Sequence, residues 1–264
     1  MKQSDPIKID GIYYRLNHDN KTAEATHNNK DKYTGSIVIP QSICFNGESY
    51  SVTTVGGCAF EFCLALISAT IPSSVTKIGE GAFIGCSGLK YVIIPNTVMD
   101  IGNCAFGGCS ELTSINIPNS ITTICDWSFY NCSSLKSITI PNSVTAIGKV
   151  AFYDCIGLNT ITIPNSVTNI GEEAFAGCTG LKSVSIPETV TNIDSNAFSS
   201  CYNLSSIKCY AYEPSDCKGN AFNGVDISKC RLFVPKESID KYKAAEGWKD
   251  FTHISAIEDM VEDD

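Results

Sequence analysis

The sequence predicts an α/β solenoid dominated by short β-strands, built from right-handed coils of 23 residues with a cap at each end. This prediction rests on phenylalanine, proline and cysteine, which each recur with a period of 23 residues. The phenylalanines are Phe60, Phe83, Phe106, Phe129, Phe152, Phe175 and Phe198. The prolines are Pro72, Pro95, Pro118, Pro141, Pro164 and Pro187. Residue types that share one period indicate stacked units that cannot bury their apolar side chains alone.

One unit, from Leu135 to Cys155, shows how a coil is built. Its first part alternates apolar and polar residues and is rich in β-branched side chains, which predicts a short strand. Pro141 then turns the chain, since proline cannot donate to a ladder. A second extended segment ends at Gly148, where we expect left-handed backbone. Stacking such coils at the strand spacing of about 4.8 Å forms parallel sheets over a continuous apolar core.

In the first strand of each coil, alternate side chains point away from the core. These outward positions are Ile67, Ser68, Thr70, Lys90, Tyr91, Ile93, Thr113, Ser114, Asn116, Lys136, Ser137, Thr139, Asn159, Thr160, Thr162, Lys182, Ser183, Ser185, Ser205, Ser206 and Lys208. Most of them are Ser, Thr or Asn, which favours a hydrated polar sheet. Tyr91 is the exception, because tyrosine is typical of protein interfaces.

Both ends depart from the period and predict caps. Asn46-Gly47 predicts a hairpin inserted into the first coil. At the other end, Phe222 falls out of step and residues 236–246 predict a short helix, followed by Trp248, Phe251 and Ile254 as a seal. We expect a single domain. It consists of an N-terminal β cap with the hairpin over residues 1–51, repeats over 52–209, a C-terminal α/β cap over 210–258 and an acidic tail over 259–264.

Half of the fourteen cysteines follow the repeat. They are Cys63, Cys86, Cys109, Cys132, Cys155, Cys178 and Cys201. Their Cβ vectors should be parallel and about one strand spacing apart, whereas a disulfide needs converging Cβ atoms about 3.8 Å apart. We therefore expect a structural ladder of buried thiols. Cys217 and Cys230 form the one pair for which we consider a disulfide, and the sequence leaves that pairing open.

Charge and motifs exclude several classes of function. The formal net charge of −9 argues against a nucleic-acid partner, and no apolar stretch is long enough to span a membrane. Catalytic serine, phosphate-loop, dinucleotide and zinc-binding motifs are missing from the sequence. We expect no enzyme, no cofactor and no metal.

The turns next to phenylalanine carry the candidate binding residues. Aligning the coils places Trp127, Tyr130, Val150 and Tyr153 on two adjacent turns. If these side chains project outward, they form an apolar patch of the kind that contacts a partner. The alternative is that they fold against neighbouring turns and shield the edge of the core. Together with Tyr91, they are the predicted partner-binding residues.

The repeat unit resembles the BspA-like leucine-rich repeats of surface and secreted proteins from anaerobic gut and mouth bacteria and some mucosal protists. The matching motifs are Ile-Pro-x-Ser-Val-Thr-x-Ile-Gly and Ala-Phe-x-x-Cys, and the resemblance extends over most of the chain. It departs where Cys125 and Asp194 replace the turn glycine and Ser128 replaces alanine. The resemblance implies a right-handed leucine-rich repeat stack that binds other molecules.

We therefore expect a non-catalytic binding or adhesion module of a Bacteroides-like cell-surface or secreted protein. It is expected to be a monomer that recognises a host or extracellular-matrix protein. A glycan-binding accessory protein in polysaccharide handling is the alternative, and a structural role in assembly is a third possibility. The first residues have no apolar signal core, so an extracellular or surface location requires that an export signal has been removed. A cytosolic location is the other option.

Overall fold

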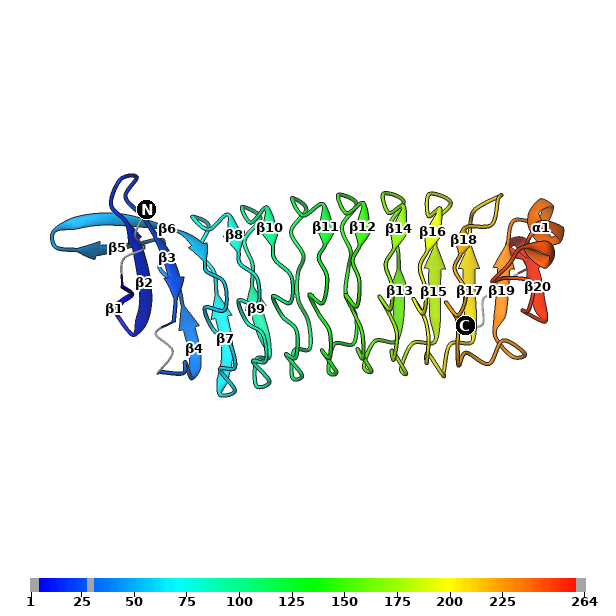
Figure 1. The fold of residues 1–264 in the computed structure, drawn as a ribbon, viewed down its shortest axis with the longest axis horizontal. Helices are drawn as coiled ribbons and strands as arrows, with labels where there is room; N and C mark the ends of the chain where they lie inside the picture. Colours follow the sequence, from blue (N-terminus) through cyan, green and yellow to red (C-terminus); the bar gives the residue numbers. More distant parts are fainter. Residues whose placement is uncertain (1–4, 28–30, 260–264) are drawn as a thin grey trace.

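Stacked coils produce a long solenoid, as predicted, and the solenoid has about nine turns. The computed structural model describes residues 5–27 and 31–259. Figure 1 shows the N-terminal hairpin at one end and helix α1 (Ile239–Ala244) at the other. The predicted acidic tail beyond Asp259 and the first four residues lie outside the described residues.

The N-terminal cap is antiparallel where it begins and parallel where it joins the coils. Strands β1 (Ile7–Ile9), β2 (Ile12–Asn17) and β3 (Thr22–Thr26) form an antiparallel meander. Strand β3 then pairs in parallel with β6 (Glu48–Val55). Strands β5 (Ser42–Phe45) and β6 form the predicted hairpin, with positive φ at Asn46 and Gly47.

The first strands of the coils form one side of the solenoid, here named the strand face. They are β4 (Gly35–Val38), β7 (Leu66–Thr70), β9 (Tyr91–Ile93), β13 (Thr160–Thr162), β15 (Ser183–Ile186), β17 (Ser206–Cys209), β19 (Arg231–Val234) and β20 (His253–Ala256). Pairing is parallel within two separate sheets, β4–β7–β9 and β13–β15–β17–β19–β20. The described coils between β9 and β13 form no paired strand on this side. The predicted outward positions are exposed or half-buried except Ser68, which is buried and donates a hydrogen bond to Ser36 Oγ at 2.8 Å.

The second extended segments form another side. They are β8 (Lys77–Ile78), β10 (Asp100–Ile101), β11 (Thr123–Ile124), β12 (Ala146–Ile147), β14 (Asn169–Ile170), β16 (Asn192–Ile193) and β18 (Asp216–Cys217). Pairing is parallel along the series and starts from β6. Within the described chain it is interrupted between β10 and β11, which belong to different sheets.

The turn glycines allow close packing between coils, and the prediction of left-handed backbone at them is wrong. Gly148 and Gly171 do not have positive φ. A Cβ atom at Gly171 would lie 2.7 Å from the carbonyl carbon of Gly148 in the preceding coil. These positions therefore require glycine because the backbones approach each other closely.

The interruption between β10 and β11 lies at the coil whose sequence departs most from the repeat. That coil has Cys125 in place of glycine and Ile121 where neighbouring coils have valine. Asp194 also stands in place of the turn glycine, and its N–H still bonds the carbonyl of Ile170 at 2.9 Å. A Cβ atom at this position is therefore not enough to break the pairing between coils. A small apolar cavity lined by Ile101, Ile121 and Cys125 occupies the junction. We attribute the separation to these two larger side chains together.

The third side, here named the turn face, surrounds the phenylalanines. Residues two before and two after each phenylalanine have positive φ, as in Trp127 at 60° and Asn131 at 54°. Their N–H groups donate to the next coil, from Trp127 to the carbonyl of Lys149 at 2.9 Å and from Asn131 to that of Tyr153 at 2.6 Å. The left-handed backbone thus turns alternate N–H groups toward the following coil.

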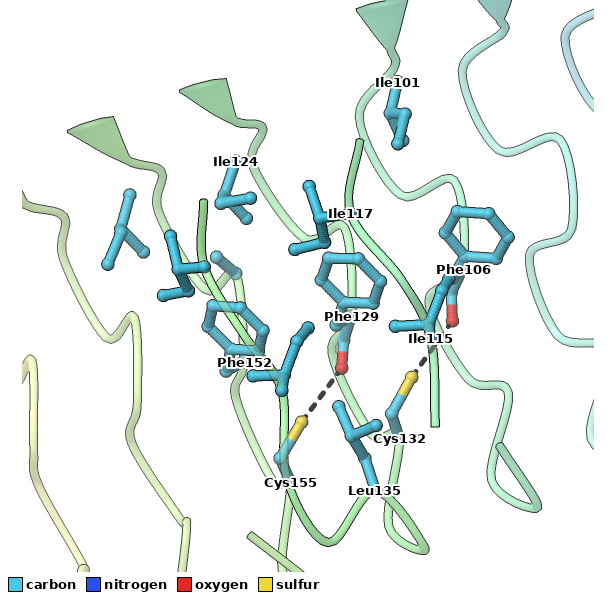
Figure 2. Packing of buried hydrophobic residues seen from close by; sticks show 14 of the residues in the cluster. Ile101, Phe106, Ile115, Ile117, Ile124, Phe129, Cys132, Leu135, Phe152 and Cys155 are labelled. Atoms are coloured by element: carbon cyan, nitrogen blue, oxygen red, sulfur yellow. Dashed lines mark hydrogen bonds between the residues drawn. The ribbon is translucent and has the colours of Figure 1, made fainter. Parts of the chain in front are cut away.

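Stacked phenylalanine rings fill the core between the three sides. Adjacent rings from Phe60 to Phe222 have centroids 4.9 to 5.7 Å apart and are nearly parallel. The column includes Phe222 despite its irregular spacing. Trp248 and Phe251 contact its ring and close the column, as predicted. Figure 2 shows the middle of this core.

Candidate interaction surfaces

The seven repeat cysteines form one buried column beside the phenylalanines. From Cys86 onward, each thiol donates to the carbonyl oxygen of the phenylalanine in the preceding coil. Two of these bonds are drawn in Figure 2, from Cys132 to Phe106 at 3.3 Å and from Cys155 to Phe129 at 3.1 Å. Burial raises the pKa of Cys109 to about 12. Thiols held neutral in this way are poor nucleophiles and metal ligands.

Cys63 ends the column and differs from the other six. Its sulfur accepts the backbone N–H of Tyr33 at 3.3 Å. The neighbouring Cys86 thiol and that N–H lower the pKa of Cys63 below that of an ordinary cysteine. The side chain is only 1% exposed, so Tyr33 covers the end of the ladder. The structure keeps all fourteen cysteines, including Cys217 and Cys230, as free thiols.

The predicted turn-face residues are only partly exposed. Trp127 is 40% exposed, and its ring meets that of Tyr130 edge-on at 5.6 Å. Tyr130 is half-buried because it lies across Gly107, where a Cβ would be 2.2 Å from the tyrosine ring. Tyr153 is also half-buried. Trp127 therefore projects outward, which is the first of the two alternatives, whereas Tyr130 packs against the neighbouring turn.

Val150 is buried, so the predicted patch of four outward side chains does not form. It occupies the position of Trp127 in the next coil but is only 1% exposed. Both residues have left-handed backbone, with φ of 58° at Val150. The branched side chain of valine is too short to extend past the surrounding turn, whereas the indole of Trp127 reaches solvent. Val150 belongs to the core and not to a binding surface.

A larger apolar area lies on the strand face near the N-terminal end. Val38 is 68% exposed, Ile67 44%, Tyr91 48% and Ile93 53%. Strand pairing aligns Val38 with Thr70 and Thr70 with Ile93, so the three lie in one row. We name Val38, Ile67, Tyr91 and Ile93 the strand-face patch. It includes the predicted residue Tyr91.

Sequence reasoning identified some of this patch and missed the rest. Ile67 and Ile93 stood out as apolar residues at outward positions, but no binding role was predicted for them. Val38 precedes the hairpin insertion, so the repeat alignment did not reach it. Tyr210 and Tyr212 were also missed. They are 43% and 58% exposed and line a groove beside the C-terminal cap.

Residues 5–27 and 31–259 contain neither a cluster of metal-binding side chains nor a membrane-spanning helix. Three or more His, Cys, Asp or Glu side chains are nowhere grouped to hold a metal ion there. None of the helices in that part of the chain has the length and apolar character needed to cross a bilayer.

Comparison with known proteins agrees with this architecture. The sequence matches the BspA type leucine rich repeat region, in six copies, over residues 53–179 and 125–245. A solved leucine-rich repeat protein of T. pallidum is 30% identical, with a TM-score of 0.64, and the match covers 75% of this chain and 90% of that one. A leucine-rich cell surface protein of Faecalibacterium prausnitzii shares the fold, with 23% identity, a TM-score of 0.56 and coverage of 97% and 96%. No curated protein matches the sequence. The chain belongs to the family of BspA-type leucine-rich repeat proteins.

Proposed function

We propose that the chain is a non-catalytic binding module of a bacterial cell-surface or secreted protein, and that it recognises a host or extracellular-matrix protein. The observation that carries the proposal is the strand-face patch. Four large apolar side chains gather there on three adjacent strands, each at least 44% exposed. Monomeric proteins seldom keep a contiguous exposed apolar patch without a partner.

Rigidity and composition favour a protein partner at this site. The patch lies on paired strands, so binding does not require ordering of a loop, which lowers its entropic cost. Tyr91 supplies the large amphipathic ring that often anchors a protein interface. The F. prausnitzii protein that shares the fold is described as a cell surface protein, which supports a similar location for this chain. The exposed Trp127 offers a smaller second surface.

The test measures binding of the purified chain to immobilised extracellular-matrix proteins, namely collagens, laminin and fibronectin. The variant Tyr91→Thr/Ile93→Thr copies Thr160 and Thr162, which occupy the matching positions in a later coil. We therefore expect it to fold normally. Its affinity should fall at least about tenfold, because two exposed anchors of the interface are lost.

A matched control removes apolar side chains elsewhere. Met99→Ser/Ile156→Ser changes two residues that are 64% and 49% exposed and lie outside the patch, and it should bind like the wild type. Trp127→Ser/Tyr153→Ser tests the turn face in the same assay. Equal binding by wild type and the Tyr91→Thr/Ile93→Thr variant would reject the strand-face patch as the interface. Absence of binding to every protein on the panel would count against a matrix partner.

A further inference from the structure

Positive charge gathers on the C-terminal half of the strand face. Lys136, Lys182, Lys208 and Arg231 all lie at outward positions, and all but the half-buried Lys208 are exposed. We name these four residues the basic face. None of the outward positions from Ile67 to Lys208, all within the described chain, carries an acidic residue. This is unexpected in a protein with a formal net charge of −9.

Three lysines on the side formed by the second extended segments are neutralised by carboxylates. The Nζ atoms of Lys77, Lys149 and Lys218 lie 2.7, 2.6 and 2.6 Å from carboxylate oxygens of Asp100, Glu172 and Asp194. Each of these pairs joins one coil to the next.

The basic face has no such partners. Among the described residues, no carboxylate lies within the 4.0 Å ion-pair distance of Lys136, Lys182, Lys208 or Arg231. Neighbouring carboxylates therefore do not neutralise the four cations of the basic face. The unpaired cations remain available to an external anion.

The spacing of the cations fits an extended polymer. The N–H of Asn159 bonds the carbonyl of Lys136, and the N–H of Lys182 bonds that of Asn159. The two lysines are thus two strand spacings apart, about 10 Å along the solenoid. Ser183 and Ser206 lie between the cations and present hydroxyl groups.

We propose that the basic face binds an anionic polysaccharide along the solenoid axis. Lysine and arginine would pair with carboxylate or sulfate groups of the polymer, while Ser, Thr and Asn side chains exchange hydrogen bonds with sugar hydroxyls. A nucleic acid fits less well. No aromatic ring stands at the outward positions between Lys136 and Lys208 to stack on bases.

The experiment is calorimetric titration of the full chain with heparin and polygalacturonate, with neutral dextran and single-stranded poly(U) alongside. Heparin or polygalacturonate should bind, and its affinity should fall as NaCl rises from about 50 to about 200 mM, because counterions compete for the lysines. Dextran should not bind, and poly(U) should bind more weakly than the polysaccharides. Tighter binding of poly(U) would overturn the assignment in favour of nucleic acid.

Two triple variants with equal change in net charge separate a site from general electrostatics. Lys136→Gln/Lys182→Gln/Lys208→Gln should weaken polysaccharide binding at least about tenfold. Lys77→Gln/Lys149→Gln/Lys218→Gln removes paired lysines on another side and should retain binding. Equal loss in both variants, or no loss in the first, would overturn the proposal.

The proposals for the strand-face patch and for the basic face can be tested independently of each other. Tyr91→Thr/Ile93→Thr should bind heparin and polygalacturonate as the wild type does, because the strand-face patch precedes the basic face along the solenoid. A loss of polysaccharide binding in that variant would contradict a site confined to the basic face.

Discussion

The thiol of Cys155 donates a hydrogen bond to the carbonyl oxygen of Phe129, with 3.1 Å between Sγ and oxygen. The same carbonyl accepts the N–H of Cys132 at 3.2 Å. The Phe129 carbonyl oxygen thus links its own coil to the next coil through the Cys155 thiol. This arrangement explains why cysteine recurs at a position that a larger apolar residue could not occupy.

Replacing this thiol should separate its polar contribution from its packing contribution. Cys155→Ala removes the donor and leaves a small cavity, and should lower the free energy of unfolding by about 1–2 kcal/mol. Cys155→Ser retains a donor and should cost less. Urea unfolding of both variants measures the difference. A serine variant less stable than the alanine variant would show that the sulfur acts through apolar volume alone.

The buried thiols should make stability fall in alkaline solution. The pKa of Cys109 is raised from 9.0 to about 12 in the folded chain, so the folded state keeps a proton that the unfolded state loses. The resulting stability is complete below pH 9 and is lost as pH rises toward 12, by about 1.4 kcal/mol per pH unit for each such thiol. Urea unfolding at several alkaline pH values should show a shallower decline for Cys109→Ala than for the wild type. Parallel declines would contradict this account.

Restoring the repeat consensus should close the ladder between β10 and β11. In the variant Ile121→Val/Cys125→Gly, we expect the amide of residue 125 to bond the preceding coil and exchange hydrogen more slowly. About two new backbone hydrogen bonds should stabilise the fold by more than the smaller apolar side chains destabilise it. The free energy of unfolding should therefore rise by roughly 1 kcal/mol. Hydrogen exchange detected by NMR measures this directly. The Cys104 amide, already bonded to the Asp126 carbonyl at 3.0 Å, is the internal control, and unchanged exchange at residue 125 would reject the explanation.

Loss of the C-terminal seal should destabilise the coils next to it more than distant ones. Trp248 is fully buried, and its Nε1–H donates to the carbonyl of Ser215 at 3.0 Å. Trp248→Ala should cost about 3–5 kcal/mol. Because coils contact mainly their neighbours, hydrogen exchange should accelerate around Phe198 and Phe222 before it does around Phe60. Uniform acceleration along the chain would indicate that the solenoid unfolds as a single cooperative unit.

Features that every coil repeats could be predicted from the sequence, because the same physical requirement acts at each copy. The alternation around Ile138 and Ile140 correctly divided inward from outward residues. The left-handed backbone could not be located in this way. The position of Trp127 and Val150 is held by Cys, Gly, Trp, Val, Glu or Asn in different coils, so it leaves no compositional pattern. Backbone hydrogen bonding to the next coil, and not residue preference, sets its conformation.

Surfaces were harder to predict because they depend on residues that depart from the repeat. Val38 joins the strand-face patch through a strand whose register shifts between Gly35 and Ser36, which no periodicity shows. The binding role of Trp127, Tyr130, Tyr153 and Tyr91 stays a prediction. Side-chain length decided the exposure of Trp127 and Val150, although their positions in the repeat are equivalent.

The interrupted pairing between β10 and β11 also has a mechanical consequence. A stack of coils hydrogen-bonded on three sides resists bending. At this junction the second extended segments are not paired and strand pairing on the strand face stops after β9, while the turn face keeps its hydrogen bonds. Bending strain should therefore concentrate there. Since the strand-face patch precedes this compliant section and the basic face follows it, the rod can change the angle between its two surfaces without unfolding a coil.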